Sequence, residues 1–208
     1  VIGYSEVSGE SSLINEIQKI DFLGIMAANS GLLTNGIVCS GSGQNLGYKK
    51  KDFFTIGGFE PVKHKESGDD MYIVQAISKL KGAIFNYDKN SFVKTLPKNS
   101  FSSYINQRIR WSSNSKLTLF TSPLFFYFLI SAFTNNVNIL ISMIFSFNIS
   151  LILIVMKFLL EGIVLYIGAK LFLTKISFFS YTVWSLTQPL YITLVGVGGL
   201  IGKFTWKK

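Results

Sequence analysis

The stretch from Gly68 to Trp111 reads GDDMYIVQAISKLKGAIFNYDKNSFVKTLPKNSFSSYINQRIRW, and it decides how the rest of the chain is interpreted. It opens with the acid pair Asp69-Asp70 at the start of a predicted helix, and it closes with Arg110 and Trp111 on a second predicted helix. From residue 118 onward charged side chains become rare. The candidate chemistry therefore lies directly before a predicted membrane region.

The composition of the chain indicates a membrane protein. Apolar residues make up 49% of the 208 residues, and the mean hydropathy is +0.39. The net charge of +9 is spread over the chain, since residues 1–117 carry 14 basic and 10 acidic side chains and residues 118–208 carry 6 basic and 1 acidic. Positive charge beside apolar segments is typical of membrane anchoring, so a nucleic-acid-binding patch is not expected.

Two reactive residue types occur only once, which limits the chemistry. Cys39 is the only cysteine and His64 is the only histidine. An intrachain disulfide, a thiolate metal cluster and a multi-histidine metal site are therefore excluded. Because the chain begins with Val1 and no signal peptide precedes it, we expect it to be cut from a longer protein.

Local patterns predict an alternation of strands and helices before the membrane region. Residues 1–7 are predicted to be the end of a strand followed by a turn, and short strands are predicted at residues 83–87 and 91–95 around an Asp-Lys-Asn turn. Apolar residues at helical spacing predict a helix from Leu13 to about Asn29, with Ser11 or Ser12 as its cap and Gly31 as its stop. Gln18 and Asp21 are expected on the polar side of this helix.

A glycine-rich loop, CSGSGQNLG, covers residues 39–47. Glycines this close together let a backbone approach a ligand closely. The spacing matches neither the Walker pattern nor the dinucleotide-binding pattern, so a flexible turn is an equally good interpretation. A short helix is predicted over residues 50–55, and Gly57-Gly58 is expected to end it.

The acid pair has a structural interpretation as well as a chemical one. Ser67 is in position to cap a helix that starts at Asp69, and Asp70 resembles the acidic member of a capping box. Acidic residues in a first turn also favour the helix dipole. Gly82 is expected to end this helix. Its buried face is predicted from five apolar residues, Ile73, Val74, Ala76, Ile77 and Leu80.

The second helix of the stretch is predicted to begin after a cap at Asn99 or Ser100 and to carry a mixed face. Gln107, Arg110 and Trp111 share this face, because side chains three and four positions apart are helical neighbours. A guanidinium pairs with phosphate oxygens, and an indole stacks on a sugar ring or a base. The alternative is an Arg–Trp pair that anchors the helix among lipid headgroups.

Three apolar segments are predicted to form the membrane region, residues 124–147, 149–171 and 184–201. The second carries Lys157 and Glu161 four positions apart, so the two charges either neutralise each other inside a bundle or line a channel. Residues 172–181 are predicted to form an interfacial helix.

The charges beside these segments give only part of the topology. Lys116, Lys170 and Lys175 place the adjoining segment ends on the cytoplasmic side. A third crossing would put the last lysines, Lys203, Lys207 and Lys208, outside, against the same tendency. A re-entrant last segment is the alternative.

The order of these motifs resembles the C-terminal half of a membrane-bound family 2 glycosyltransferase, the broad group of cellulose, hyaluronan and poly-N-acetylglucosamine synthases. The specific elements are Asp69-Asp70 and, about forty residues later, Gln107-x-x-Arg110-Trp111. Three weaker elements occur in the same order, Gln18-x-x-Asp21-Phe22, Gly43-x-Asn45-x-x-Tyr48-Lys49-Lys50 and Gly57-Gly58-Phe59. The resemblance implies an α/β fold in which residues 1–117 are the acceptor side of a GT-A, Rossmann-like domain. Residues 118–208 would form an α-helical transmembrane region.

The resemblance also implies roles for individual residues. Asp70 matches the general base that accepts the proton of the acceptor hydroxyl. The element from Gln107 to Trp111 matches the motif that holds the donor diphosphate and the acceptor sugar, and the glycine-rich loop matches the border of the acceptor site. The substrate-binding positions implied in this way are Asp69, Gln107, Arg110, Trp111, Asn45 and Tyr48.

The chain departs from the family pattern at three points. Gly68-Asp69 replaces the commoner Thr-Glu, and Lys49 stands where arginine is usual. No Asp-x-Asp element, which binds the divalent metal in this family, occurs in the chain. We therefore assign no metal ligand to these residues, and we expect the Mg²⁺ or Mn²⁺ of the full-length enzyme to be bound upstream of Val1.

The activity implied is inverting transfer of a sugar from a nucleotide-sugar donor to a saccharide or lipid-linked acceptor. The reaction would take place at the cytoplasmic face of the inner membrane, in polysaccharide or glycolipid synthesis. Membrane lipids are expected partners, a homo-oligomer is left open, and nucleic acid is not expected. The alternative is a non-catalytic membrane protein that retains a degenerate form of the fold.

Overall fold

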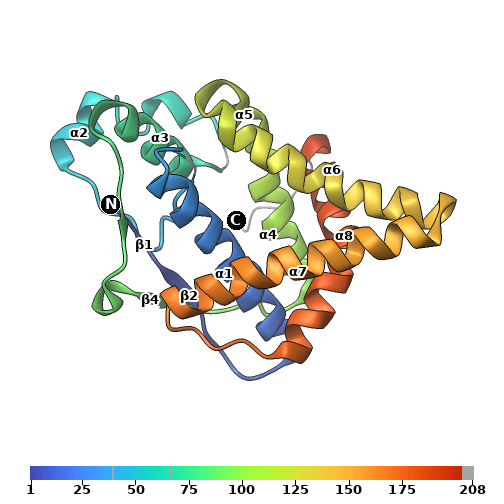
Figure 1. The fold of residues 1–208 in the computed structure, drawn as a ribbon. Coiled ribbons are helices and arrows are strands. Elements are labelled where there is room, and N and C mark those ends of the chain that lie inside the picture. Colours follow the sequence, from blue (N-terminus) through green and yellow to red (C-terminus); the bar gives the residue numbers. More distant parts are fainter. Residues whose placement is uncertain (39, 66, 203–208) are drawn as a thin grey trace.

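The computed structural model describes residues 1–38, 40–65 and 67–202, and these residues are predominantly helical (Figure 1). The helices are α1 Leu13–Thr34, α2 Lys50–Thr55, α3 Asp69–Lys81, α4 Phe101–Ser113, α5 Ser115–Thr121, α6 Pro123–Phe145, α7 Phe147–Leu171 and α8 Phe178–Ile201. The strands are β1 Ile2–Gly3, β2 Ser5–Val7, β3 Phe85–Asn86 and β4 Val93–Thr95.

The strands form two separate two-stranded sheets, and both pairings are parallel. Ile2 pairs with Phe85, and Ser5 pairs with Val93, so one N-terminal segment pairs with two strands that follow each other in sequence. The predicted strands at residues 83–87 and 91–95 therefore do not pair with each other. Parallel pairing needs a long crossover, which helices α1 to α3 supply. These few short strands leave the GT-A fold a prediction.

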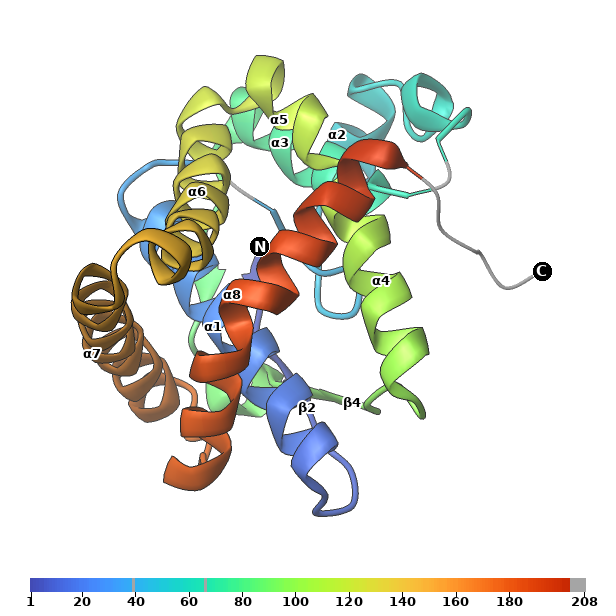
Figure 2. The same ribbon diagram turned by 90° about the vertical axis from the view of Figure 1, so that its right-hand side faces the viewer.

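Helix α1 lies at the centre of the molecule and is longer than predicted (Figure 2). Ser12 caps it as expected, but the helix continues through Gly31 and ends at Thr34, because buried Leu33 extends the packed face. The left-handed turn is at Gly36 instead, where φ is 75°. Gln18 and Asp21, predicted on the polar side, are buried at 3% and 6% exposure. Other elements therefore cover the polar side of this helix, and Gln18 and Asp21 face them instead of solvent.

Helix α3 begins without a side-chain cap. Its N-cap residue is Gly68 at a φ of 93°, so the predicted cap by Ser67 and the capping box are wrong. Such a positive φ favours glycine, and a Cβ at this position would also lie 2.8 Å from Asn114 Oδ1. Gly82 ends the helix as predicted. Leu80 is 51% exposed and does not belong to the buried face.

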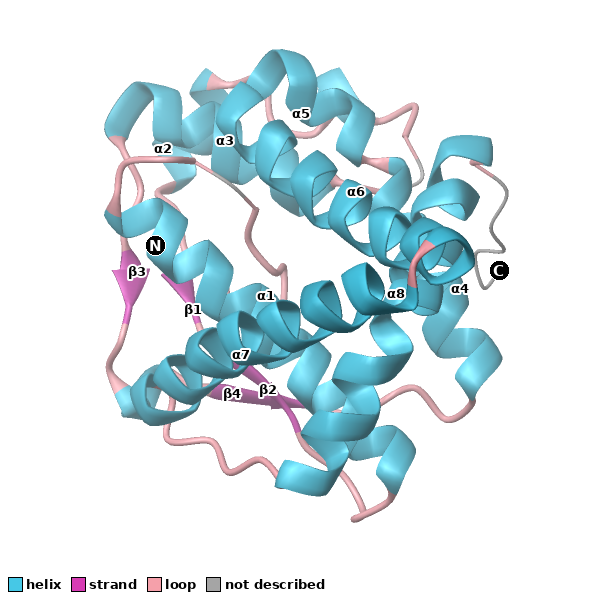
Figure 3. Cartoon of the chain, turned by 45° about the vertical axis from the view of Figure 1, so that its right-hand side comes forward, coloured by secondary structure: helices cyan, strands magenta, loops and turns pink. Residues whose placement is uncertain are grey.

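Helices α6, α7 and α8 are each long and apolar enough to cross a membrane, which indicates a membrane protein. Helices α6 and α7 form a hairpin whose far end projects from the rest of the molecule (Figures 1 and 3). Apolar side chains there are largely exposed, as at Ile144 and Phe145. Helix α8 begins at Phe178 rather than at the predicted Trp184. The predicted interfacial helix is absent from this described part, since residues 172–177 form a loop.

The loop after α7 joins the apolar helices to the strands. Phe172 is 2% exposed and stacks on the ring of Tyr4 at a centroid distance of 4.2 Å. The Tyr4 hydroxyl is hydrogen bonded to Thr174 Oγ1 at 2.8 Å, and burial raises the pKa of Tyr4 to about 12. The main hydrophobic core therefore contains residues from both sides of residue 117, and the division into two domains stays a prediction.

The end of α8 lies beside the start of the apolar region. Lys116 Nζ donates a hydrogen bond to the Leu200 carbonyl oxygen at 2.9 Å, within the last turn of α8. This contact favours a re-entrant last segment over a third crossing. The lysines on which the topology question was first based, Lys203, Lys207 and Lys208, lie outside the described residues.

This arrangement predicts which introduced cysteines share a side of the membrane. In a Cys39→Ser background, Asn148→Cys at the tip of the α6–α7 hairpin should react with an impermeant maleimide from one side. Lys175→Cys and Gly202→Cys should both react from the other side, since Lys175 follows Thr174, which bonds to Tyr4, and Gly202 follows Leu200, which bonds to Lys116. Labelling of Gly202→Cys from the Asn148 side would establish a third crossing and contradict the prediction.

Candidate active site

The acid pair and the glycine-rich loop meet at the start of α3. Asp70 Oδ2 accepts a hydrogen bond from the Gly43 backbone N–H at 3.1 Å, and Asp70 Oδ1 accepts one from the Met71 N–H at 2.8 Å. The loop approaches α3 so closely that a Cβ at Gly41 would lie 2.8 Å from Val74 Cγ2. Gly41 therefore has a packing role here, because a side chain at this position would push the loop away from Asp70.

The two acids have different surroundings. Asp69 is exposed, whereas Asp70 is half-buried. Burial raises the pKa of Asp70 above its ordinary value, the two backbone N–H groups partly oppose this, and the charge of Asp69 adds to it. A half-buried carboxylate with a raised pKa is suited to accept a proton, and an exposed acid in a first turn is suited mainly to stabilise the helix.

Arg110 on α4 is directed toward the same acids. Its Nη1 donates a hydrogen bond to Ser67 Oγ at 3.0 Å, and Asn114 Nδ2 donates to that oxygen at 3.1 Å. Burial lowers the pKa of Arg110, while the charges of Asp70 and Asp69 raise it. Ser67 therefore fixes the guanidinium instead of capping α3. The result is a positive charge beside a proton acceptor, contributed by two different helices.

Gln107 and Trp111 lie on a separate side of α4, where they line a small cavity of about 60 Å³. The three residues predicted to share a face therefore have different surroundings: Gln107 and Trp111 line the cavity, whereas Arg110 bonds to Ser67. Other cavity-lining residues include Gln18, Phe22, Gln44, Thr95 and Lys98. Gln44 follows the loop residue that binds Asp70, and its Nε2 donates to Thr95 Oγ1 at 2.8 Å. The cavity and the acid pair are therefore neighbours along the loop.

Asn45 and Tyr48 do not line this cavity, and neither takes part in the hydrogen bond between Gly43 and Asp70. Asn45 Nδ2 donates to the carbonyl oxygens of Tyr4 and Ser91, at 2.9 and 2.8 Å, and so ties the loop to the break between β1 and β2. Tyr48 is 42% exposed and stacks on Phe53. Their predicted place at the border of the acceptor site stays a prediction.

Sequence reasoning missed the pair Asp21 and Arg108. Arg108 is 5% exposed, and its Nε donates to Asp21 Oδ2 at 2.7 Å. Burial disfavours the charged guanidinium, but the Asp21 carboxylate outweighs this, so the pKa of Arg108 is raised. One signal was available, because Asp21 stands between the apolar residues Ile20 and Phe22, both of which are buried.

The described residues do not fit a metal site. Among them, no group of three or more His, Cys, Asp or Glu side chains is placed to hold an ion. Both oxygens of Asp70 already accept backbone hydrogen bonds. The expected Mg²⁺ or Mn²⁺ stays a prediction, and no step below depends on it.

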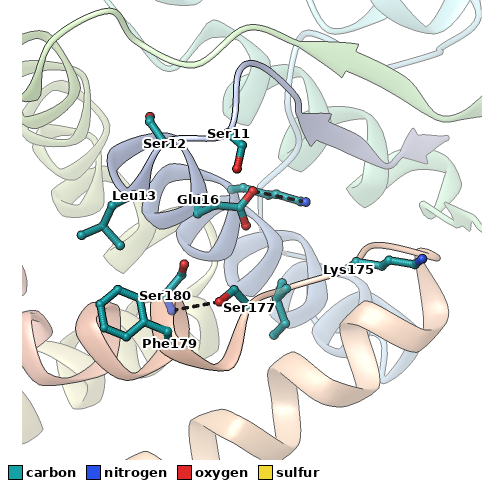
Figure 4. A pocket seen from close by; sticks show the side chains of 10 residues that line it. Ser11, Ser12, Leu13, Glu16, Lys175, Ser177, Phe179 and Ser180 are labelled. Carbon is teal, nitrogen blue, oxygen red and sulfur yellow. Dashed lines mark hydrogen bonds and ion pairs between the residues drawn. The ribbon is translucent and has the colours of Figure 1, made fainter.

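A larger hollow of about 520 Å³ lies elsewhere, between the start of α1 and the start of α8 (Figure 4). Its lining is mixed: four serines, three charged side chains and three apolar ones, namely Ser11, Ser12, Ser177, Ser180, Glu16, Lys19, Lys175, Leu13, Ile176 and Phe179. None of the predicted site residues lines it, so its size alone does not identify a substrate site.

The sequence matches the family model described as Glycosyl transferase family 21 over residues 2–206. The chain belongs to this family. The match covers both the acid pair and the apolar helices, and it supports glycosyl transfer as the class of activity. It is to family 21 and not specifically to the cellulose and hyaluronan synthases that the motifs first suggested. No curated protein and no solved structure matches the chain.

Proposed function

We propose that this family 21 glycosyltransferase transfers a sugar, with inversion, from a nucleotide-sugar donor to a saccharide or lipid-linked acceptor at the cytoplasmic membrane face. The observation that carries the proposal is the convergence of Asp70 on α3 and Arg110 on α4 beside the Gly43 loop. In this proposal residues 1–117 form the acceptor side of a GT-A domain.

Asp70 acts in this proposal as the general base. Its carboxylate takes the proton of the acceptor hydroxyl while the acceptor oxygen forms a bond to the anomeric carbon of the donor. The bond from that carbon to the donor diphosphate breaks, and the diphosphate leaves with the electron pair. Attack from the face opposite the leaving group inverts the anomeric carbon. The raised pKa supports this role, because a stronger base accepts the proton more readily.

Arg110 stabilises the leaving diphosphate. A guanidinium has five N–H donors in a planar fork that fits phosphate oxygens, and it stays charged at all relevant pH values. Ser67, which also accepts a hydrogen bond from Asn114, holds the side chain in place before the substrate arrives. Such preorganisation is what makes a fixed charge effective in a transition state.

Gln107 and Trp111 contact the acceptor. An indole face suits the apolar face of a sugar ring, and a glutamine side chain bonds to hydroxyl groups. The cavity that they line is about 60 Å³, well below the range of roughly 300–1,000 Å³ for complete ligand pockets. It therefore accommodates one edge of an acceptor. Helix α4 also packs on the apolar helix α8, where a Cβ at Gly198 would lie 2.9 Å from Ile109 Cγ1.

The test is transfer of labelled sugar by membranes that contain the full-length protein. Nucleotide sugars are supplied one at a time, with a total lipid extract or with soluble saccharides as acceptors. Label in the organic phase identifies a lipid acceptor, and label retained as polymer identifies a saccharide acceptor. Donor binding without transfer to any acceptor would support the degenerate, non-catalytic alternative and contradict the proposal.

Arg110→Lys is expected to raise the KM for the nucleotide sugar roughly 10-fold or more, because lysine keeps the charge but loses the planar two-point contact. Steady-state kinetics with varied donor measure the change. The matched control is Arg108→Lys, which makes the same exchange two residues away and is expected to leave the donor KM unchanged. Wild-type donor kinetics in Arg110→Lys would remove the phosphate role and favour the headgroup anchor.

A further inference from the structure

A buried polar network joins three helices at the wall of the candidate acceptor cavity. Its centre is the ion pair of Asp21 on α1 and Arg108 on α4, with 2.7 Å between Asp21 Oδ2 and Arg108 Nε. The hydroxyl of Tyr191 on α8 donates to the same Asp21 oxygen at 3.3 Å. Tyr104 on α4 completes the network, since its hydroxyl donates to Tyr191 Oη at 3.1 Å.

Arg108 lines the cavity itself and contacts the other two residues that line it from α4. Its guanidinium carbon lies 4.2 Å from the centre of the Trp111 ring, and its Nη1 donates to Gln107 Oε1 at 3.2 Å. The Trp111 ring also packs on Phe22, at a centroid distance of 5.9 Å. The indole is therefore held by a cation and an aromatic ring, both of which are buried.

The Arg108 guanidinium also contacts the ring of Tyr104, whose centre lies 4.9 Å from the guanidinium carbon. A planar guanidinium that contacts aromatic rings and bonds along its edge has a fixed orientation. Apolar side chains of similar volume would often stabilise a core as well as a buried ion pair does. What they would not supply is a directed hydrogen bond to Gln107 or a cation against Trp111.

We propose that Arg108, held by Asp21 and Tyr191, is a positioning residue that orients Gln107 and Trp111 toward the acceptor. The assignment rests on the proposed function in giving those two residues the acceptor. Arg108 also borders the cavity, but it is 5% exposed and its Nε and Nη1 bond to Asp21 and Gln107, so it acts on the acceptor through Gln107 and Trp111. Through Tyr191 the orientation of the acceptor residues also depends on how α8 is seated against α1 and α4.

The decisive variant is Arg108→Lys in the full-length protein. Lysine keeps a positive charge beside Asp21, so the fold is preserved, but it loses the planar contact with Trp111 and the hydrogen bond to Gln107. The expected result is an acceptor KM raised about tenfold, with the donor KM and the melting temperature close to wild type. Arg110→Lys is the matched control, and it should raise the donor KM while the acceptor KM stays close to wild type.

Tyr191→Phe extends the test to α8. It removes one hydroxyl and keeps the ring, so the Asp21–Arg108 pair remains while its link to α8 is lost. We expect a smaller rise of the acceptor KM, about two- to fivefold, and again no change for the donor. Equal effects on donor and acceptor kinetics in both variants would indicate a general structural role and overturn the assignment.

A readout without turnover separates this inference from the proposed function. Trp184→Phe and Trp206→Phe leave Trp111 as the only tryptophan, and Trp184 Nε1 has no hydrogen-bond partner to lose among the described residues. In this background Arg108→Lys should increase acrylamide quenching of Trp111, and Arg110→Lys should not. Unchanged quenching and acceptor KM in an active enzyme would overturn the inference alone. Absence of transfer in the wild type would overturn the proposed function, and quenching would still decide the inference.

Discussion

Asp70→Asn is expected to leave folding, membrane insertion and donor binding in place and to lower the rate of sugar transfer about 10²- to 10⁴-fold. Asparagine keeps the volume of the side chain and one acceptor oxygen, so one of the two backbone hydrogen bonds, from Gly43 or from Met71, is retained and the other is lost. It has no basic carboxylate, so the acceptor hydroxyl keeps its proton. Transfer and donor binding, measured on the full-length protein at matched expression, separate these effects.

Asp69→Asn is the matched control, because it makes the same exchange one residue away. Asp69 is exposed, and its loss should cost about 0.3–1 kcal/mol of helix stability with little effect on transfer. Both acids lie in the first turn of α3, so an effect on the helix dipole alone would make the two variants alike. Equal and modest losses of activity would return both residues to a structural role.

The pH profile gives a second check on Asp70. A general base works in its ionised form, and burial raises the pKa of Asp70 above its ordinary value. The rate should therefore fall as the pH is lowered through that raised pKa, at a higher pH than an exposed aspartate would give. The free energy of unfolding should change with pH in the opposite direction to the rate. Because the folded state binds the proton of Asp70 more tightly than the unfolded state, Asp70 stabilises the fold at low pH. This contribution is lost as the pH rises through the raised pKa. The acid limb of the rate profile should be absent in Asp70→Asn.

Asp21→Asn is expected to lower the free energy of unfolding by about 3–5 kcal/mol, the largest loss of stability that we predict for a single substitution. The change leaves Arg108 buried and charged without its carboxylate, and Tyr191 loses its anionic acceptor. For a chain of this size the loss corresponds to a melting temperature roughly 6–20 °C lower. Thermal unfolding of the purified full-length protein in detergent measures it, with exposed Asp69→Asn as the control.

A double variant distinguishes a buried unpaired charge from a loss of packing. Asp21→Leu with Arg108→Met removes both charges and keeps similar side-chain volume, so most of the stability should return. The acceptor KM should stay high, because neither leucine nor methionine orients Gln107 and Trp111. A double variant as unstable as Asp21→Asn would show that the loss comes from shape and not from charge.

The sequence alone determined the features that depend on neighbouring residues. The starts of α1 and α4 at Ser12 and Ser100 follow from side-chain caps, and the end of α3 follows from Gly82. The three apolar helices follow from length and composition, which a membrane constrains more strongly than any tertiary contact. The glycosyltransferase class followed from the spacing of Asp70 and the motif that ends at Trp111, and the family match agrees with it.

Only the tertiary structure decided which side chains meet. Helical periodicity placed Asp21 on a polar side, but it contains no information on whether another helix covers that side, and the carboxylate is buried because Arg108 pairs with it. Ser67 fits a cap by its position, yet it accepts a hydrogen bond from Arg110, forty-three residues away. The strands pair with an N-terminal segment and not with each other. In each case the partner is distant in sequence, and the free energy of burying and pairing polar groups outweighs the small local preferences that a sequence pattern expresses.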